Sequence, residues 1–474
     1  MQGELLGACA LIGLFAALIG LAEILARRTA MAPEWTRKLV HLGGGLGCLL
    51  FPLLVDNPFT VLVLALCFSG IFWLGERRRW LLCLCRVSRQ SRGSVYYPFA
   101  IAVLFWLTAD RYGLYLSAVL VLTVSDTAAA LVGSRYGRIR YRTGGVDDHK
   151  SLEGSLIFWL LSFLAVWIPL VLWGEADLGQ ALLSAFLTAT MLTMVEAVSI
   201  GGRDNLYVPL LASFMLLKVV SKPVAELVLQ SASVVLLFGV LIALNRYGRL
   251  LRSNALMIMG ILVYGIWSLG SVDWAVPLVA AFAGFAIVFI ASGMAQKRTR
   301  VYRRMAVLSV PAAALTLAAN LTGAFSFLYG PFLVAVLVPL VWGVVMQLRD
   351  SPAPPSWRWS IRQSGAALGA TLLVLVEPVL MHRASDAASV AVLALGSGSA
   401  AWIGIGLTAK WPRFSGGSAV LTTTCTAILL TAGGQATGGL SNWKPSLWAD
   451  IYDRNVDVMF PIHPALSGHL GAEP

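Results

Sequence analysis

The chain has 474 residues, of which 58% are hydrophobic and only 12% are charged, and its mean hydropathy is +0.79. These values exclude an ordinary soluble enzyme and a disordered chain, and they predict a polytopic integral membrane protein. The formal net charge of +12 suits contact with anionic lipid head groups and nucleotides. Nucleic acid is not an expected partner.

Apolar runs of about 16 to 23 residues recur along the chain, and each is close to the length of helix that crosses a ~30 Å hydrocarbon core. Because lipid cannot satisfy open backbone groups, these runs predict an all-α fold of about sixteen transmembrane helices, within a range of about 14–17. The predicted spans are 4–26, 38–55, 58–75, 94–109, 113–134, 154–173, 179–199, 205–220, 225–244, 254–270, 273–292, 305–319, 325–346, 364–381, 387–408 and 416–433.

The segments that connect these spans alternate in charge. Every second segment is basic, and the basic segments hold most of the 35 lysine and arginine residues. The positive-inside pattern therefore places the basic segments in the cytoplasm and both termini on the outer side. We expect an integral membrane protein, in the cytoplasmic membrane if the source is bacterial, whose active site faces the cytoplasm.

Polar motifs concentrate in the N-terminal half, whereas the later spans contain few carboxylates. We therefore expect the chemistry to lie in the first part of the chain. The predicted organisation is a catalytic membrane domain (1–225), further membrane helices without an assigned role (226–349), a Pro-rich cytoplasmic linker (350–362), C-terminal membrane helices (363–440) and a polar tail (441–474).

An aspartate lies inside the fifth predicted span. Asp126 falls toward the cytoplasmic end, and helical spacing places Gly133 and Gly137 on its face, where small residues admit a close neighbour. A carboxylate inside a span is costly, so it usually faces a cavity, a cation or a partner. Asp126 is therefore a candidate catalytic or metal-binding residue. The plainer alternative is a carboxylate that pairs with an arginine or caps a broken helix.

A basic, glycine-bearing loop follows this aspartate. GSRYG, at 133–137, leads into a run of arginines and then to Lys150. Glycines allow backbone amides to approach phosphate oxygens, and basic side chains neutralise those oxygens. Gly133, Arg135 and Gly137 are thus candidate phosphate-binding residues, and the alternative is an ordinary positive-inside loop.

The motif KSLEGS opens the sixth predicted span. A helix start presents free backbone amides to an anion, so Lys150, Ser151 and Gly154 are candidate phosphate-binding residues, with Lys150 also a candidate catalytic cation. Glu153 suits such a place if a divalent cation lies between it and the phosphate. The alternative is a carboxylate that merely favours the helix dipole.

Glu196 is another carboxylate near a cytoplasmic helix end, and GGRDN follows it at 201–205. Carboxylates from different spans, together with Asp204, could supply ligands to Mg²⁺, with water and phosphate completing the coordination shell. Arg203 is a candidate phosphate-binding residue and Asn205 a further member of the site. Asp204 could equally cap the eighth helix.

Two more motifs open spans on the same edge of the membrane. RKLVH opens the second span and places Arg37 or Lys38 beside His41 on one helix face, and RGSVYYP opens the fourth span and contains Tyr97. Arg37 and Lys38 are candidate phosphate-binding residues, whereas His41 and Tyr97 are supporting candidates. A lone histidine at a helix start is more often structural than catalytic.

In order and approximate spacing, RKLVH, RGSVYYP, SDTAAALVGSRYG, KSLEGS and EAVSIGGRDNLYVPL resemble the membrane polyprenol kinase family. That family includes phytol, farnesol and dolichol kinases and CTP-dependent diacylglycerol kinases. The resemblance, over residues 30–225, implies transfer of the γ-phosphoryl group, usually from CTP and with Mg²⁺, to a lipid alcohol. By position it implies a set of metal and catalytic carboxylates, namely Asp126, Glu153, Glu196 and Asp204. It also implies a set of phosphate-binding groups, namely Lys150, Arg37, Lys38 and the 133–142 loop.

Other functions stay open. SDT…G…G…KSxEG also resembles the CDP-diacylglycerol synthases, but their later lysine, aspartate and HGG-type motif is absent, whereas DNLYVPL is present. TAGGQATGG in the C-terminal half faintly resembles a family that includes phytyl-phosphate kinases, without the carboxylates that a second phosphorylation would need. A third alternative is a non-enzymatic transport or assembly subunit with a kinase-like site. The motifs leave open the acceptor alcohol, CTP over ATP, and the oligomeric state.

Overall fold

The computed structural model of the chain describes residues 2–29, 33–85, 92–142, 149–248, 253–291, 309–349, 365, 368–376, 378–379, 387–410, 416–438 and 440. The predicted linker 350–362, the predicted tail and parts of the predicted span 364–381 lie outside the described residues. Contacts divide the chain into two units, Met1–Leu237 and Phe238–Pro474.

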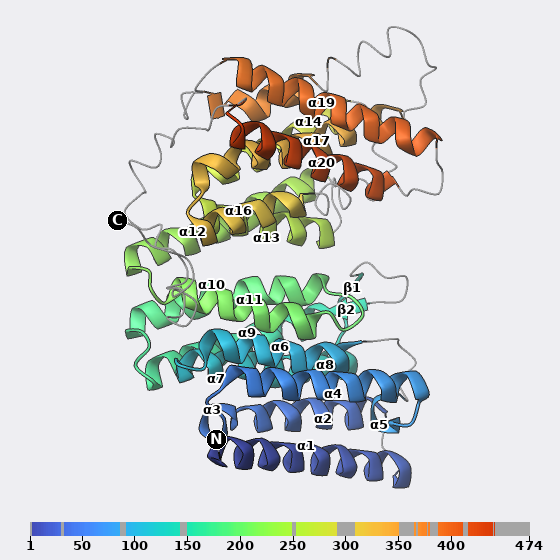
Figure 1. Ribbon diagram of the computed structural model, residues 1–474, viewed down its shortest axis with the longest axis vertical. Helices are drawn as coiled ribbons and strands as arrows, with labels where there is room; N and C mark the ends of the chain where they lie inside the picture. Colours follow the sequence, from blue (N-terminus) through green and yellow to red (C-terminus); the bar gives the residue numbers. More distant parts are fainter. Residues whose placement is uncertain are drawn as a thin grey trace. The chain divides into compact units, whose positions relative to one another are not determined.

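The first unit is a bundle whose helices run side by side (Figure 1). Its helices are α1 (Gln2–Arg28), α2 (Pro33–Cys48), α3 (Phe51–Leu54), α4 (Pro58–Arg78), α5 (Leu82–Cys85), α6 (Gly93–Thr108), α7 (Tyr112–Leu120), the π-helical turn η1 (Val121–Ser125), α8 (Asp126–Tyr136), α9 (Leu152–Leu172), α10 (Leu178–Val198), α11 (Asp204–Val219) and most of α12 (Val224–Gly248).

Two short strands interrupt the helices of this unit. β1 (Arg140–Arg142) pairs antiparallel with β2 (His149–Ser151), and Tyr141 stands opposite Lys150. The all-α prediction is correct apart from this hairpin. The hairpin carries Lys150, one of the predicted site residues, toward the interior of the unit.

The second unit packs around α17 (Phe325–Arg349), whose segment Phe325–Val345 is almost entirely buried. Phe332 and Trp342 of α17 are fully buried, and Trp274 packs against Phe332 with ring centroids 4.7 Å apart. The other helices of this unit are α13 (Ser253–Gly270), α14 (Val272–Ala291), α16 (Val310–Thr322), α19 (Ala387–Lys410) and α20 (Gly416–Ala436).

Within the described residues, 8 helices are long and apolar enough to cross a membrane, which agrees with a polytopic membrane protein. They comprise Gly3–Arg28, Pro58–Arg78, Tyr112–Tyr136, Leu152–Leu172, Leu178–Val198, Val224–Ala243, Phe325–Val345 and Ala419–Ala436. Shorter apolar helices accompany them, among them Gly93–Thr108 and Val310–Thr322. The count of about sixteen spans and the outer position of both termini remain predictions.

Two predicted spans are not continuous α-helices. The span 38–55 divides into α2 and α3, with Pro52 in the first turn of α3, where its missing N–H costs nothing. The span 113–134 contains η1 between α7 and α8. A π-helical turn changes which residues share a face, so it alters how the side chains that follow it are presented.

Candidate functional site

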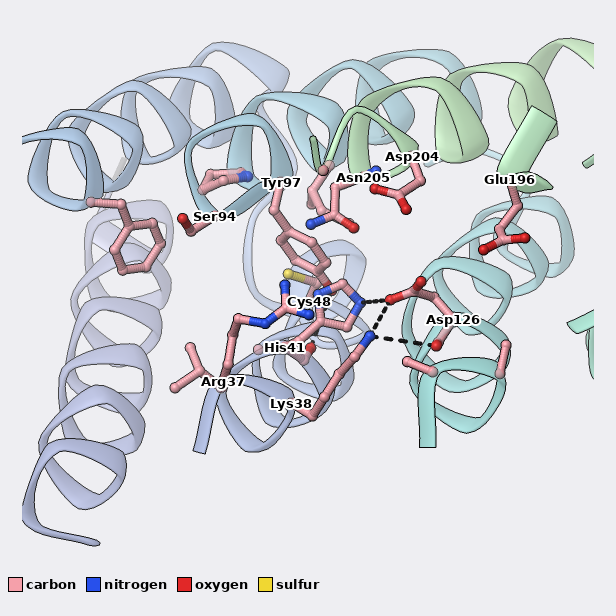
Figure 2. Close-up of a pocket in the computed structure, with 18 of the residues that line it drawn as sticks. Arg37, Lys38, His41, Cys48, Ser94, Tyr97, Asp126, Glu196, Asp204 and Asn205 are labelled. Carbon is pink, nitrogen blue, oxygen red and sulfur yellow. Dashed lines mark hydrogen bonds and ion pairs between the residues drawn. The ribbon is translucent and has the colours of Figure 1, made fainter. Parts of the chain in front are cut away.

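One cavity in the first unit brings together most of the residues that the sequence nominated (Figure 2). Its volume is about 530 Å³, and its walls come from α1, α2, α3, α4, α6, α8, the β1–β2 hairpin, α9, α10 and the start of α11. The predicted residues that line it are Arg37, Lys38, His41, Tyr97, Asp126, Gly133, Lys150, Ser151, Gly154, Glu196, Asp204 and Asn205.

Asp126 is the first residue of α8 and lies among groups from α2. Lys38 Nζ donates to Asp126 Oδ2 at 2.6 Å, and His41 Nε2 lies 3.3 Å from the same oxygen (Figure 2). The Lys38 side chain is 5% exposed and that of Asp126 14%. The carboxylate therefore pairs with a lysine and a histidine, and not with the arginine that was one of the two plainer alternatives for it.

The π-helical turn before Asp126 supplies another contact. It presents the Leu122 carbonyl oxygen to His41 Nε2 at 2.9 Å. Since Nε2 lies close to two acceptors, Leu122 O and Asp126 Oδ2, we assign the proton of a neutral His41 ring to Nε2. His41 thus ties the orientation of the Asp126 carboxylate to the backbone of η1.

Tyr97 packs against this network from α6. Its ring meets the His41 ring edge-on, with centroids 4.7 Å apart, and its hydroxyl lies 3.2 Å from Thr123 Oγ1. Gly45 makes this approach possible, because a Cβ there would collide with Thr123 and Tyr97. The sequence reasoning included His41 and Tyr97 but gave no signal for Thr123.

Lys150, on β2, also lines the cavity. Its ammonium contacts the Glu196 carboxylate and lies 3.7 Å from Asp204 Oδ2. Burial disfavours the charged ammonium, but the two carboxylates outweigh burial and raise the pKa of Lys150 above its usual value. The sequence placed Lys150 at a phosphate, and the structure adds that it compensates two carboxylates.

The hairpin and the start of α9 hold Lys150 in place. Tyr141 is its partner across the strands, and the Tyr141 hydroxyl lies 2.6 Å from Ser155 Oγ. Burial raises the pKa of Tyr141. Ser151 caps α9, since its Oγ accepts the Gly154 N–H at 3.1 Å.

Gly133 and Gly154 allow α8 and α9 to pack closely beside the cavity. A Cβ at Gly154 would lie 2.9 Å from the Ala129 carbonyl oxygen and 3.2 Å from Gly133 Cα. Their small size therefore has a packing role in addition to the phosphate-binding role that the sequence suggested.

Four nominated residues do not line the cavity, namely Arg135, Gly137, Glu153 and Arg203. The Glu153 carboxylate instead accepts the backbone N–H groups of Arg138 at 2.9 Å and Ile139 at 3.1 Å. Glu153 follows Ser151 by two positions, and residues at that spacing do not share a helix face. Arg135 lies over the Tyr136 ring, 5.5 Å from its centroid.

Sequence reasoning missed the apolar wall of the cavity. Phe15, Leu18 and Ile19 of α1 line it, together with Phe68 and Phe72 of α4. No signal marked these residues, because apolar side chains inside a membrane span are expected to contact lipid. His149 and Ser94 also line the cavity without having been singled out.

The carboxylates of the cavity can serve a cation only together with other ligands. In the part of the chain that the structure describes, no group of three or more His, Cys, Asp or Glu side chains is placed to hold a metal ion. Asp126 and Glu196 each contact a lysine, and Asp204 lies near the second of these lysines. Mg²⁺ commonly binds through one or two carboxylates plus substrate phosphates, and this donor set fits that mode.

Comparison with known proteins finds a clear relative. The chain is 34% identical to the phytol kinase of Synechocystis sp. over 210 residues, which are 42% of this chain and 87% of that protein. No protein-family profile matches the chain. No solved structure matches it either.

Proposed function

The chain belongs to the membrane polyprenol kinase family, and we propose that it transfers the terminal phosphoryl group of CTP to the hydroxyl group of an isoprenoid alcohol, such as phytol, farnesol or a polyprenol, at the cytoplasmic edge of the membrane. The observation that carries the proposal is the composition of one cavity. Lysine, arginine and carboxylate side chains of α2, α8, the hairpin, α10 and α11 line one part of it, and phenylalanine and aliphatic side chains of α1, α3 and α4 line another. Such a cavity suits a donor phosphate, a hydroxyl group and an apolar tail together.

The cationic groups would bind the phosphates of the donor. Arg37 and Lys38 of α2 and Arg140 and Lys150 of the hairpin line the cavity. Phosphoryl transfer requires mainly positioning and neutralisation of the transferring group, and cations that line one cavity supply both. In this proposal Lys38 and Lys150 exchange part of their contact with carboxylates for contact with phosphate oxygens.

Asp126 would accept or orient the proton of the acceptor hydroxyl. Lys38 and His41 both contact Oδ2, so we assign Oδ1 to the hydroxyl group. Glu196 is the alternative base, but it contacts Lys150. Asp126 is favoured because two side chains of α2, Lys38 and His41, hold its Oδ2 in place (Figure 2).

Asp204 and Asn205 would hold Mg²⁺ with one oxygen from Glu196 or Asp126, and the donor phosphates would complete the coordination shell. When bound, Mg²⁺ supplies neutralisation of the phosphoryl oxygens. We leave Glu153 out of this set because its carboxylate is bonded to the backbone of Arg138 and Ile139.

The test is phosphoryl transfer by the purified full-length protein in detergent. γ-Labelled CTP or ATP is offered with Mg²⁺ to phytol, farnesol, a dolichol and diacylglycerol. We expect label on an isoprenoid alcohol with CTP, loss of that product in Asp126→Asn, and its retention in Asp177→Asn, a matched change at the N-cap of α10 outside the cavity.

Two outcomes would contradict the kinase proposal. One is a labelled cytidylyl lipid formed from α-labelled CTP and phosphatidate, which would identify a CDP-lipid synthase. The other is a folded protein that labels no acceptor, which would favour a binding or transport role.

A further inference from the structure

The apolar end of the cavity is a chamber bounded by α1, α3 and α4. We call it the tail chamber, and its walls include Phe15, Leu18, Ile19, Phe51, Phe68 and Phe72. It is continuous with the site of Lys38, His41 and Asp126, because the same cavity contains both. An alcohol whose hydroxyl group lies at Asp126 would place its tail in this chamber.

Three aromatic rings from different helices meet at one end of the tail chamber. The Phe15 ring is edge-on to Phe51, with centroids 5.9 Å apart, and edge-on to Phe68, with centroids 5.4 Å apart. Phe51 is 5% exposed, and its ring packs against that of Phe105, with centroids 6.3 Å apart. Edge-to-face pairs of this kind stabilise one another, so the three rings form a firm end wall.

The depth of the chamber follows from α2, which runs along it. Lys38 lies at the charged end of α2, and Cys48 ends this helix three residues before Phe51. Both residues line the cavity. They are ten helical residues apart, or about 15 Å at ~1.5 Å per residue. An isoprene unit has four main-chain carbon bonds of ~1.5 Å, which advance the extended chain by roughly 5 Å. The depth therefore matches about three units, and a fourth is accommodated by bending the tail.

The volume of the cavity, which includes the charged end, also limits the tail to a short one. The whole cavity measures about 530 Å³, within the range of roughly 300–1,000 Å³ that accommodates one small ligand. A polyprenol of nine or more units would be at least ~45 Å long when extended and could not be enclosed.

We propose that the tail chamber selects acceptor alcohols by length, favouring tails of three to four isoprene units over long polyprenols, with Phe15, Phe51 and Phe68 as the stop. The proposal rests on the proposed function for the fate of the hydroxyl group. Binding of the tail can be measured without transfer, so the two ideas can be tested separately.

Gly44 provides a direct way to fill the chamber. It lines the cavity, and a Cβ at this position would meet no atom within 4 Å. Gly44→Leu should therefore place a side chain in the chamber without forcing α2 to move. Gly20→Leu is the matched control, because Gly20 is exposed on α1, does not line the cavity and also has no neighbour within 4 Å of an added Cβ.

The experiment measures equilibrium binding of labelled prenols with three, four and nine to eleven units to the full-length protein in detergent, and then phosphoryl transfer to each. We expect the short prenols to bind at least tenfold more tightly than the long ones. Gly44→Leu should weaken binding of the short prenols at least tenfold, and Gly20→Leu should leave it within twofold. Phe15→Ala should reduce the preference for short tails at least tenfold, with Phe15→Leu as the second variant if the alanine variant unfolds.

Equal binding of all lengths, or unchanged binding in Gly44→Leu, would overturn the proposal. Transfer to all lengths with equal kcat/KM would also overturn it while supporting the kinase function. Length-selective binding that Gly44→Leu abolishes, without transfer to any prenol, would support the chamber and contradict the kinase function.

Discussion

Lys38 on α2 and Asp126 on α8 form an ion pair in the interior of the first unit, with 2.6 Å between Nζ and Oδ2. The two residues are 88 positions apart in the sequence. The pair joins the RKLVH motif to the SDT motif and sets the position of the proposed base. Because both side chains are largely shielded from water, either one without the other would leave a poorly solvated charge.

The effects of removing the two members of this pair should therefore not add. We expect Lys38→Met and Asp126→Asn each to lower the free energy of unfolding by about 3–5 kcal/mol, because each variant leaves one buried charge without its partner. The double variant should lose less than the sum of the single changes. Thermal unfolding of the wild type, the two single variants and the double variant in detergent measures this double-mutant cycle.

Arg27→Met is the control for that cycle. Arg27 bonds to Glu23 at 2.7 Å but is 56% exposed, so its loss should cost no more than about 1 kcal/mol. Additive effects of Lys38→Met and Asp126→Asn would contradict the coupling of the two charges.

Lys150 should contribute to stability in a way that does not change between pH 7 and pH 9. Glu196 and Asp204 raise the pKa of Lys150 in the folded protein despite burial. A group with a raised folded pKa stabilises fully below its unfolded pKa, about 10.4 for lysine, and loses this contribution as the pH climbs through the folded pKa.

The measurement is the difference in melting temperature between the wild type and Lys150→Met as a function of pH. We expect a constant difference from pH 7 to pH 9 and a smaller one above about pH 10.4. A difference that already shrinks between pH 7 and pH 9 would mean that burial of Lys150 outweighs its carboxylate partners.

Asp204 and Glu153 should differ in their effect on the Mg²⁺ requirement. Asp204 lines the cavity, so Asp204→Asn should raise the Mg²⁺ concentration for half-maximal phosphoryl transfer by at least ~10-fold. Glu153→Gln should change it by less than about twofold and lower only the melting temperature, because its carboxylate accepts backbone N–H groups outside the cavity. The reverse ranking would restore Glu153 as a metal ligand.

The sequence predicts the helices of this protein better than their interruptions. The predicted spans 154–173 and 179–199 coincide closely with α9 and α10, because the length of an apolar run determines a membrane helix. The π-helical turn Val121–Ser125 gave no signal in the sequence, because the predicted span 113–134 is one continuous apolar run; its Leu122 carbonyl oxygen contacts His41, 81 positions away in the sequence.

The same contrast holds for the candidate site. Charged residues near the ends of apolar helices stand out in such a sequence, and Lys38, Asp126 and Lys150 do line one cavity. Glu153 also stands out, but the direction of its side chain is set by its position on the first turn of α9. Phe15 gives no signal at all, because a phenylalanine in a membrane span is unremarkable until its neighbours are known.

The close packing of α8 against α9 should make Gly154 intolerant of even a methyl group. A Cβ there would lie 2.9 Å from the Ala129 carbonyl oxygen and 3.2 Å from Gly133 Cα, and backbone atoms cannot yield as a flexible side chain does. We expect Gly154→Ala to cost about 1–3 kcal/mol of stability. Gly70→Ala in α4, where an added Cβ meets no atom within 4 Å, should instead be neutral or stabilise by up to ~1 kcal/mol.

Thermal unfolding of both variants provides the comparison. Because Ser151 and Lys150 adjoin the contact between α8 and α9, Gly154→Ala should also raise the KM for the nucleotide. An alanine at Gly154 that leaves both quantities unchanged would show that the two helices can separate without disturbing the hairpin.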